Sequence, residues 1–350
     1  MPDTDIEEGP SCPLPFSDYE RVVLAHGGGG RVMQRLIRDL FVAAFGGAAL
    51  ERGHDGAVLR PRGPIAVTTD AFTVSPRTFP GGDLGSLAVH GTVNDLAMCG
   101  ARPLALTASF ILEEGLELRE LATLVEHMAA AARSCGVEVV TGDTKVVERG
   151  KGDGVFITTT GVGELLVDPP PGPERLAPGD AIVVSGPIGE HGVAVLAARE
   201  GLSLEPPLVS DAGPVHAAAL ALVEACEVHC LRDPTRGGLA SVLAELATAS
   251  GSSMHIREAD VPVRPAVADT CELLGLDPLY VACEGRFVAF VPAAQVDDAL
   301  ACLRRSGCEQ AAHIGALGPA SADPLVFAES ALGGRRILDL LSSEQLPRIC

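Results

Sequence analysis

The sequence is poor in aromatic side chains and in positive charge. It has no Trp and only 2 Tyr in 350 residues, and 26 Lys and Arg face 46 Asp and Glu, which gives a formal net charge of −20. Nucleic-acid-binding proteins use basic patches and aromatic platforms, so no nucleic acid is expected as a partner, and the acidic charge argues against an anionic membrane. A nucleotide could approach so acidic a chain only with a metal ion or focused basic groups, and we expect Mg²⁺.

Long apolar runs are also missing. No stretch approaches the ~18 apolar residues that a membrane-spanning helix needs, and the acidic first residues lack the apolar segment of a secretory signal. We therefore expect a cytoplasmic protein whose 10 cysteines are mostly free and buried. Cys226, His229 and Cys230 offer three metal ligands in one short run, but no second cluster has zinc-like spacing, so a metal site there is the less favoured alternative.

The length and the apolar content are sufficient for two domains. Hydrophobic residues make up 47% of the chain, and because aromatics are few the core must consist mainly of Ala, Val, Leu and Ile. Predicted strands and helices intermix without the alternation of a Rossmann sheet, so we expect an α+β fold with helices packed on a mixed sheet in each domain. The predicted organisation is a leader (1–25), a first domain (26–168), a Pro-rich linker (169–179), a second domain (180–335) and a mobile tail (336–350).

Four consecutive glycines, Gly27, Gly28, Gly29 and Gly30, precede a predicted helix. Glycine lets backbone N–H groups turn toward an anion, and a helix N-terminus favours negative charge, so the run could cradle phosphate. Its spacing matches neither a Walker A loop nor G-x-G-x-x-G, and flexible linkers look similar, so both interpretations stay open.

Three aspartates stand where they could bind a hard cation. Asp70 and Asp143 each follow a predicted strand, and Asp95 lies in a polar break of a predicted helix over 85–98. Carboxylates at strand ends can converge on Mg²⁺, which takes oxygen ligands and bridges to phosphates. The alternative is that single aspartates cap helices. Lys145 could contact a phosphate or a substrate, or be an ordinary surface lysine.

Two further segments carry candidate ligand-facing residues. The run Asp233-Pro234-Thr235-Arg236-Gly237-Gly238 could be a tight turn and helix start, but a turn needs neither the Arg nor two glycines, which favours a loop that faces a ligand. Glu284 lies next to a predicted strand over 287–291. It is either an exposed turn residue or a general base whose pKa is raised by burial.

The last residue of the sequence is Cys350. A thiol at a chain end is untethered on one side, so it could be charged with a group in one place and moved to another. The alternative is that the position has no significance, because the chemistry of a cysteine depends on its surroundings. Prenylation does not explain it, since the C-a-a-X motif needs three residues after the cysteine.

Taken together, these strings resemble the HypE family of [NiFe]-hydrogenase maturation factors, within the superfamily of aminoimidazole ribonucleotide synthetase, selenophosphate synthetase and thiamine-monophosphate kinase. The resemblance runs in order from about His26 to Cys350, and the final four residues are its most specific part. The strings that carry it are Thr68-Thr69-Asp70, Phe79-Pro80-Gly81-Gly82-Asp83, Gly91-Thr92-Val93-Asn94-Asp95-Leu96-Ala97, Gly100-Ala101-Arg102-Pro103, Val140-Thr141-Gly142-Asp143-Thr144-Lys145-Val146-Val147, Asp233-Pro234-Thr235-Arg236-Gly237-Gly238-Leu239-Ala240 and Pro347-Arg348-Ile349-Cys350.

The resemblance implies a two-domain PurM-like fold, a homodimer formed through the first domain, and ATP with Mg²⁺ as cofactors. It also implies the reaction: a carbamoyltransferase, HypF, places a carbamoyl group on the terminal thiol, and ATP-dependent dehydration converts it to a thiocyanate. The cyano group then passes to iron on a HypC–HypD scaffold complex. The alternatives are another ATP-dependent enzyme of the superfamily, such as a selenophosphate synthetase or a small-molecule kinase, and a non-catalytic cysteine carrier.

The family's site residues transfer by position onto this sequence. The resemblance implies that Asp70, Asp95 and Asp143 hold Mg²⁺ and ATP, that the glycine run covers phosphates, and that Asp233 and Thr235 line the same pocket. It further implies Lys145 and Glu284 as a proton-transfer pair and Cys350 as the carrier of the substrate. Two positions depart from the family pattern: Gly28 stands where a Ser is usual, and Cys283 precedes the glutamate where an Asn is expected.

Overall fold

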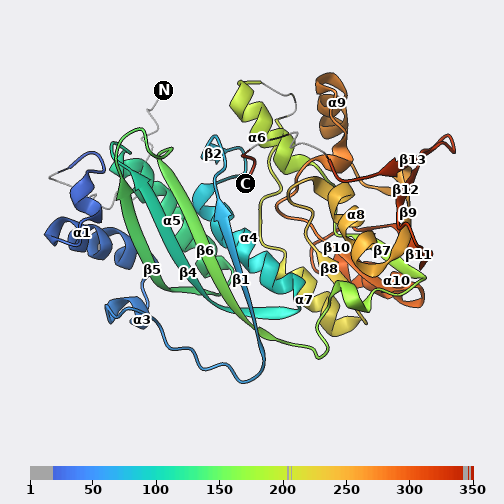
Figure 1. The fold of residues 1–350 in the computed structure, drawn as a ribbon, viewed down its shortest axis with the longest axis horizontal. Helices are drawn as coiled ribbons and strands as arrows, with labels where there is room; N and C mark the ends of the chain where they lie inside the picture. The colour runs from blue at the N-terminus through green and yellow to red at the C-terminus, as the bar shows by residue number, and fades with distance from the viewer. Residues whose placement is uncertain (1–18, 203–204, 206, 342–345, 347) are drawn as a thin grey trace, which may run out of the picture.

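Two α+β units lie side by side in the computed structural model (Figure 1), which describes residues 19–202, 205, 207–341, 346 and 348–350. The first unit holds a four-stranded sheet in the order β1-β6-β4-β5, and the second holds a seven-stranded sheet in the order β13-β12-β9-β11-β7-β10-β8. The predicted α+β fold, with helices packed on a mixed sheet in each unit, is therefore confirmed.

The first unit packs its longest helices, α4 and α5, on one face of the sheet (Figure 1). Helix α5 buries Leu121, Val125 and Met128, whose spacing in the sequence places them on one face of the helix. On the opposite face the sheet is open, and edge strand β1 exposes Ile65 and Val67 there. The elements are η1 (Leu24–Gly27), α1 (Arg31–Leu36), the π-helix η2 (Ile37–Val42), α2 (Ala43–Phe45), α3 (Ala48–Glu51), β1 (Ile65–Phe72), β2 (Thr78–Phe79), β3 (Gly82–Asp83), α4 (Leu84–Met98), β4 (Ala101–Glu113), α5 (Leu118–Ser134), β5 (Glu138–Val147) and β6 (Val155–Leu165).

The second unit buries the neighbouring strands β7 and β10, which lie between β11 and the edge strand β8, because both are almost continuously apolar. Among the described residues no helix is both long and apolar enough to cross a membrane. The elements are η3 (Pro173–Arg175), β7 (Asp180–Val184), α6 (Glu190–Glu200), α7 (His216–Ala225), β8 (Cys230–Arg232), α8 (Gly238–Ser250), β9 (Ser252–Arg257), η4 (Glu258–Asp260), α9 (Pro265–Leu274), η5 (Pro278–Tyr280), β10 (Val288–Pro292), η6 (Ala293–Gln295), α10 (Val296–Arg305), β11 (Ala312–Ala320), β12 (Val326–Glu329) and β13 (Arg335–Leu338).

Two boundaries that were expected from the sequence, those of the leader and of the tail, fall within structured segments. Most of the expected leader lies outside the described residues, but Arg21 bridges to Glu117 and Val22 is buried in the first core. At the other end of the chain, the expected tail boundary at 336 falls inside β13, which pairs with β12 through four backbone positions. Edge pairing holds this segment because it can add to an existing strand, which a boundary based on composition does not detect.

Candidate active site

Four carboxylates from separate elements gather where the two units meet. Asp70 lies on β1, Asp95 on α4, Asp233 in the loop before α8, and Glu284 in the loop before β10. Asp70 was expected just past a strand, but it lies inside β1, because the strand continues in register with β6 as far as Phe72. Each of the four groups interacts electrostatically with others of the set.

The surroundings of these carboxylates penalise their charged forms. Burial raises the pKa of Asp70 and of Asp95, and the nearby Asp70 charge raises that of Asp95 further. The hydroxyl of Thr68 donates to Asp95 at 2.7 Å, which lowers the pKa in part. Burial, with the Asp95 charge as a second cause, raises the pKa of Asp233 to about 7. The cluster therefore needs protons or cations to be stable.

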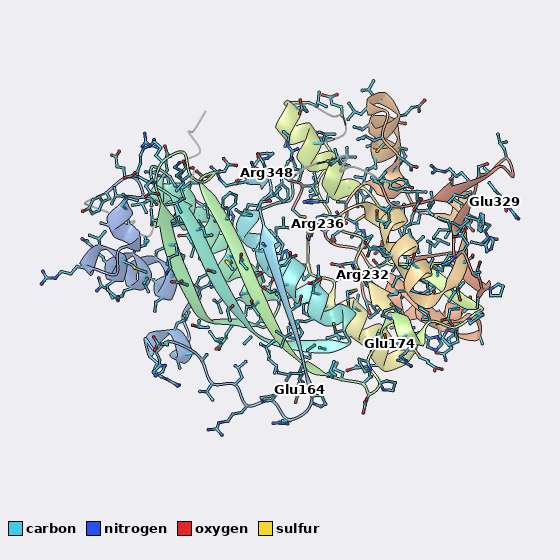
Figure 2. All side chains as sticks on the ribbon, viewed as in Figure 1. Glu164, Glu174, Arg232, Arg236, Glu329 and Arg348 are labelled. Atoms are coloured by element: carbon cyan, nitrogen blue, oxygen red, sulfur yellow. The ribbon has the colours of Figure 1, made fainter. Side chains whose placement is uncertain are left out.

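Few protein cations are placed to neutralise this cluster. Arg236 and Arg232 lower the carboxylate pKa values, but both are exposed, and Arg232 also pairs with Glu245 at 3.2 Å (Figure 2). Within the described ranges, no three His, Cys, Asp or Glu side chains form a preformed metal cage. Mg²⁺ is usually held by one or two carboxylates together with phosphates and water, so the surplus of carboxylate oxygen at this place fits that ion.

Glu284 is the most deeply buried member of the cluster, with 4% of its surface exposed. Burial raises its pKa well above the usual range, and the charges of Asp233 and Asp211 add to the effect. Its Oε1 atom is buried and has no hydrogen-bond partner. An unpaired buried acceptor is costly in a folded protein, so this oxygen marks a place where a ligand donor would bind.

A buried aspartate that the sequence analysis missed holds the Glu284 loop in place. The carboxylate of Asp211 is fully buried and accepts the N–H groups of Glu284 and Gly285 at 3.3 and 3.2 Å. A Cβ atom at Gly285 would lie 1.8 Å from the Asp211 carbonyl oxygen, so only glycine fits there. No motif or periodicity distinguishes Asp211, because its partners are backbone amides far along the chain.

Thr235 lies in the same neighbourhood as Glu284. Pro234, just before it, accepts the N–H of Cys283 at 2.9 Å, which joins the Asp233 loop to the Glu284 loop. At the end of this loop, Gly238 has φ +62 and packs against the backbone of Leu279 and Val281, so the glycine pair serves close packing as well as turning.

The end of the chain is docked against the segment that follows β1. The N–H and hydroxyl of Thr73, directly after β1, donate to a Cys350 oxygen at 3.1 and 3.2 Å, and the N–H of Ser75 donates to Arg348. Arg348 returns a bond to the Thr73 carbonyl at 3.1 Å, so the chain end runs along segment 73–75 between the two units (Figure 2). Ile349 is 2% exposed, whereas Cys350 is half-buried. The carrier thiol expected from the sequence is thus next to the strand that holds Asp70.

Asp143 and Lys145 do not join this cluster within one chain. Asp143 lies inside β5, at the sheet edge opposite β1, and the register aligns it with Ser109, Thr158 and Ala71 across the sheet. Three strand spacings of about 4.8 Å separate the two edges by roughly 14 Å. Because neighbouring residues of a strand point to opposite faces, Asp143 also faces away from the side that Asp70 occupies. One chain therefore cannot bring Asp70, Asp95 and Asp143 around one ion, as the sequence analysis expected.

The surroundings of Asp143 also differ from those of the clustered carboxylates. It is 55% exposed and pairs with Lys145 at 2.8 Å, and this hydrogen bond lowers its pKa. Asp143 was expected to follow a strand, but β5 extends to Val147, so Asp143 and Lys145 both lie inside it. Their exposure on the open face of the sheet leaves them accessible to a partner or ligand.

The glycine run lies at this same β5 edge. Gly27 is half-buried against Val146, and a Cβ atom there would lie 2.7 Å from the Val146 nitrogen. Gly28, Gly29 and Gly30 are exposed, and Gly29 has φ +74, a conformation that favours glycine. Gly27 is thus explained by packing. The three other glycines present their backbone at the surface, where the N–H of Gly28 donates to the Ala25 carbonyl at 3.4 Å and that of Gly29 to Met33 Sδ at 3.1 Å.

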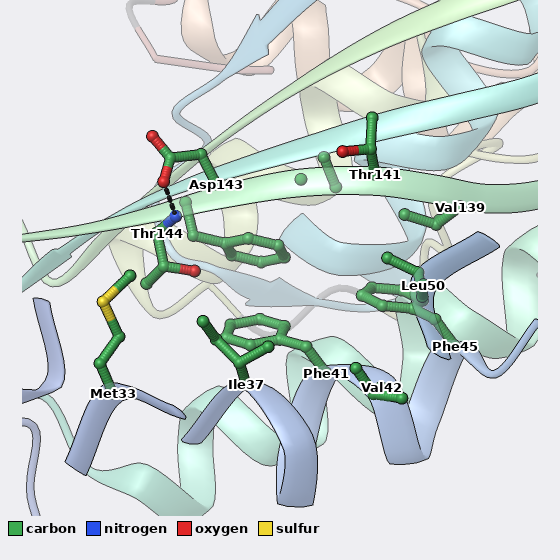
Figure 3. Close-up of a pocket in the computed structure, with 13 residues that line it drawn as sticks. Met33, Ile37, Phe41, Val42, Phe45, Leu50, Val139, Thr141, Asp143 and Thr144 are labelled. Carbon is green, nitrogen blue, oxygen red and sulfur yellow. Dashed lines mark hydrogen bonds between the residues drawn. The ribbon is translucent and has the colours of Figure 1, made fainter. Parts of the chain in front are cut away.

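An apolar cavity of about 100 Å³ lies between the N-terminal helices and β5 (Figure 3). Phe41, Phe45 and Phe110 contribute to its wall, and Thr141 and Asp143 lie at its polar side. A cavity with aromatic walls and a polar rim suits a flat heteroaromatic ring.

The three alternative metal ligands, Cys226, His229 and Cys230, do not act together in the structure. His229 pairs through Nδ1 with the buried Asp180 at 2.8 Å, and burial raises the pKa of Cys230 to about 12. A neutral, buried thiol is a poor metal ligand. As part of the described chain, Cys226, His229 and Cys230 do not form a metal cluster.

Both units match family models described as AIR synthase related protein, the N-terminal domain over residues 53–165 and the C-terminal domain over 177–323. The carbamoyl dehydratase HypE of Azotobacter vinelandii is 51% identical over 337 residues, which cover 94% of this chain and 97% of that protein. The crystal structure of hydrogenase maturation protein HypE in complex with ATP is 49% identical, with a TM-score of 0.91 over 94% of this chain and 99% of that one. A chain of a HypE–HypF complex is 42% identical, with a TM-score of 0.76 over 87% and 99%.

Proposed function

Because this chain belongs to the HypE family and is an ATP-dependent carbamoyl dehydratase of hydrogenase maturation, we propose that its substrate is a carbamoyl group carried on its own Cys350. The product is a thiocyanate on the same sulfur, which supplies the cyanide ligand for the iron of [NiFe]-hydrogenase through a HypC–HypD scaffold. The observation that carries the proposal is the position of Cys350, docked on Thr73 directly after β1, the strand that holds Asp70.

The proposed reaction balances in two steps. The carbamoyl oxygen attacks the γ-phosphorus of ATP and ADP leaves, because an amide oxygen departs readily only after it has been phosphorylated. Loss of the remaining N–H protons and departure of phosphate with that oxygen then leave S–C≡N. The first step needs cationic groups around the transferring phosphoryl group, and the second needs a base near the nitrogen.

Glu284 is the proposed base. Its unpaired Oε1 provides an acceptor for a carbamoyl N–H, and Asp211 fixes the loop that carries it. Burial and the neighbouring carboxylate charges raise the pKa of Glu284, which favours its protonated form while those carboxylates are unneutralised. A cation at Asp95 and Asp233 would favour its ionised form, so the base would become active when the nucleotide site is filled.

Asp70, Asp95 and Asp233 are proposed to hold Mg²⁺ with the phosphates, and the bound ion would stabilise negative charge on the phosphoryl group. Thr68 orients Asp95 through the hydrogen bond to Oδ2. The raised pKa values support this assignment, because they report carboxylates that are buried without sufficient counter-charge, and for Asp95 and Asp233 a neighbouring carboxylate adds to the effect.

The β5 edge is proposed to bind the rest of the nucleotide. The apolar cavity would take the adenine ring, and the exposed glycines would contact phosphate oxygens through backbone N–H groups. Lys145 would then face the phosphates or the carbamoyl group. The absence of a hydroxyl at Gly28 leaves these backbone contacts unchanged.

A homodimer would unite the two halves of this site. Strands β1 and β5 are the open edges of one sheet, and β1 exposes Ile65 and Val67 on the uncovered face. We propose that β1 of one copy lies against β5 of a second copy, so that the carboxylate cluster of one chain meets the glycine edge of the other. Such an arrangement buries the exposed apolar residues and removes both free edges.

The partner that charges Cys350 is proposed to be a HypF-type carbamoyltransferase. Since the thiol must reach another protein and then return, the chain end would alternate between the docked position and an extended one.

Intact-protein mass spectrometry tests the proposal. The chain is incubated with the carbamoyltransferase, carbamoyl phosphate and ATP, and Cys350→Ala is the control. The expected result is the gain of one carbamoyl group followed by the loss of one water, with no change in Cys350→Ala. A stable carbamoyl adduct that never loses water would reduce the chain to a carrier, and no adduct would return it to the small-molecule chemistry of the superfamily.

A further inference from the structure

A buried histidine contacts the docked chain end. His191, in the first turn of α6, is fully buried and its Nε2 lies 2.7 Å from the carbonyl oxygen of Ile349. That carbonyl belongs to the peptide group that joins Ile349 to Cys350. A bond at this oxygen therefore fixes the peptide plane from which the Cys350 side chain projects.

The hydrogen bonds around His191 define its tautomer. Burial lowers the pKa of His191 to about 4, so the ring is neutral near pH 7 and carries one N–H. The Ile349 carbonyl can only accept, so the proton lies on Nε2, and Nδ1 accepts from the hydroxyl of Ser210 at 2.8 Å. Ser210 accepts in turn from the N–H of Ala212 at 2.9 Å. Each donor in this series of hydrogen bonds therefore has one acceptor.

Residues of the first unit also pack against the ring of His191. Phe79 packs edge-on against it with a centroid separation of 5.3 Å, and Pro80 accepts the N–H of Ser210 at 2.8 Å. Gly81 has φ +99, and a Cβ atom there would lie within 3.0 Å of Val209 and Ser210. The Phe79-Pro80-Gly81 string is therefore explained by contact with this segment of the second unit.

The same segment leads directly to the proposed base. Ser210 orients His191, and the next residue, Asp211, binds the backbone amides of Glu284 and Gly285. Two consecutive residues thus connect the docked chain end with the loop that carries Glu284. A shift of the chain end and a shift of the base loop would both act on this one stretch of backbone.

We propose that His191 is a positioning residue that recognises the docked chain end and places the Cys350 thiol at the reaction site. The inference rests on the proposed function in one respect, namely that Cys350 carries the reacting group. His191 touches no reacting atom, so its removal is expected to undock the chain end and leave the ATP site and the charging of the thiol intact.

The first test measures docking without the reaction. Cys350 is alkylated with iodoacetamide at pH 7.5, and its modification is followed by peptide mass spectrometry in wild type, His191→Leu and His191→Gln. Leu removes the donor, whereas the amide nitrogen of Gln can replace Nε2–H. We expect alkylation about tenfold faster in His191→Leu and a rate near wild type in His191→Gln. The control is His313→Leu, which removes another histidine–carbonyl bond, of 2.9 Å, on β11.

The second test separates charging from dehydration in single turnovers. In His191→Leu, carbamoylation by the carbamoyltransferase is expected to be unchanged or faster, and water loss about tenfold slower or worse. His191→Gln is expected to recover most of the dehydration rate. ATP affinity and melting temperature, measured in parallel, identify a variant that has lost its fold.

The two tests fail for different reasons. Unchanged alkylation of Cys350 in a folded His191→Leu protein would overturn the inference, whatever the reaction. Faster alkylation that Gln does not reverse would also overturn it, because the donated hydrogen bond would then not be the cause. Absence of water loss in the wild-type protein would contradict the proposed function. The role of His191 in docking would then be decided by the alkylation result alone.

Discussion

The two edges of the first sheet place the same residue type in opposite states. At the β1 edge, Asp70 and Asp95 are held near other carboxylates, and their pKa values are raised. At the β5 edge, Asp143 is exposed, paired with Lys145, and its pKa is lowered. The first edge lacks positive charge and is arranged for an arriving cation, whereas the second is already neutralised and lies beside an apolar cavity. This difference supports the proposal that the two edges are half-sites with separate tasks.

The largest expected effect concerns Glu284, the proposed base in the carboxylate cluster at the β1 edge. Glu284→Gln keeps the shape of the side chain but cannot take a proton, so dehydration should slow by about 10²–10⁴-fold. Carbamoylation of Cys350 and ATP binding should change little, and single-turnover mass spectrometry measures all three. Glu245→Gln, an exposed glutamate paired with Arg232, is the control. Normal dehydration in Glu284→Gln would remove Glu284 from the mechanism.

Asp95→Asn should affect ligand binding and stability in opposite directions. The amide keeps a hydrogen bond with Thr68 but removes one negative charge from the cluster, so the affinity for Mg²⁺ and ATP should fall about tenfold or more. The ligand-free protein should become more stable by about 1 kcal/mol, because like charges no longer repel. Calorimetric titration and thermal unfolding measure the two effects. A destabilised Asp95→Asn protein would show that the cluster is not limited by repulsion.

The pH dependence of Asp233→Asn sharpens the comparison. The pKa of Asp233 is about 7 in the folded chain and 3.8 in a model compound, so the folded state binds more protons between these values. Wild-type stability contributed by this group is therefore present below about pH 4 and is lost as the pH rises to about 7, by at most about 1.4 kcal/mol per pH unit.

The measurement is the difference in melting temperature between Asp233→Asn and wild type, both without nucleotide, from pH 4 to pH 8. The difference should grow in favour of the variant as the pH rises, and saturating Mg²⁺ with ATP should reduce it. Subtraction of the wild-type curve is needed because His191, with a folded pKa of about 4, acts in the opposite direction. A difference independent of pH would mean that Asp233 is ionised throughout.

The smallest expected effect is at the β5 edge. Asp143→Asn removes an exposed ion pair with Lys145, so the free energy of unfolding should change by less than about 1 kcal/mol, with no gain in stability. Chemical denaturation at neutral pH measures this. A stabilisation as large as that of Asp95→Asn would erase the distinction between the two edges.

Local structure was well predicted from the sequence, because it depends on neighbouring residues. The helix predicted over 85–98 is α4, and the apolar face of α5 is buried as its spacing indicated. Sheet order was not predictable from periodicity. The sequence places Asp70 and Asp143 after similar strands, but β6 and β4 lie between those strands, so the two residues are on opposite edges.

The residues that position the site were not predictable for a related reason. Asp211 binds backbone amides more than 70 positions away, and His191 binds a carbonyl 158 positions away. Backbone partners leave no side-chain motif in the sequence. The sequence analysis singled out no residue near His191, and only the meeting of the two units gives this histidine its proposed role.

The central claim is that the two edges belong to one site shared between two copies of the chain. Glu284→Gln and Lys145→Met, each expected to be inactive alone, are co-expressed with different tags, and the mixed dimers are assayed for ATP-dependent water loss. If the site is shared, each mixed dimer has one intact site of its two. Half of the dimers in a random mixture are mixed, so the mixture should recover about a quarter of wild-type activity. Co-expression of Glu284→Gln with Asp95→Asn, both at the β1 edge, should recover no more activity than these two variants have alone. Inactive mixed dimers in the first case would contradict the account.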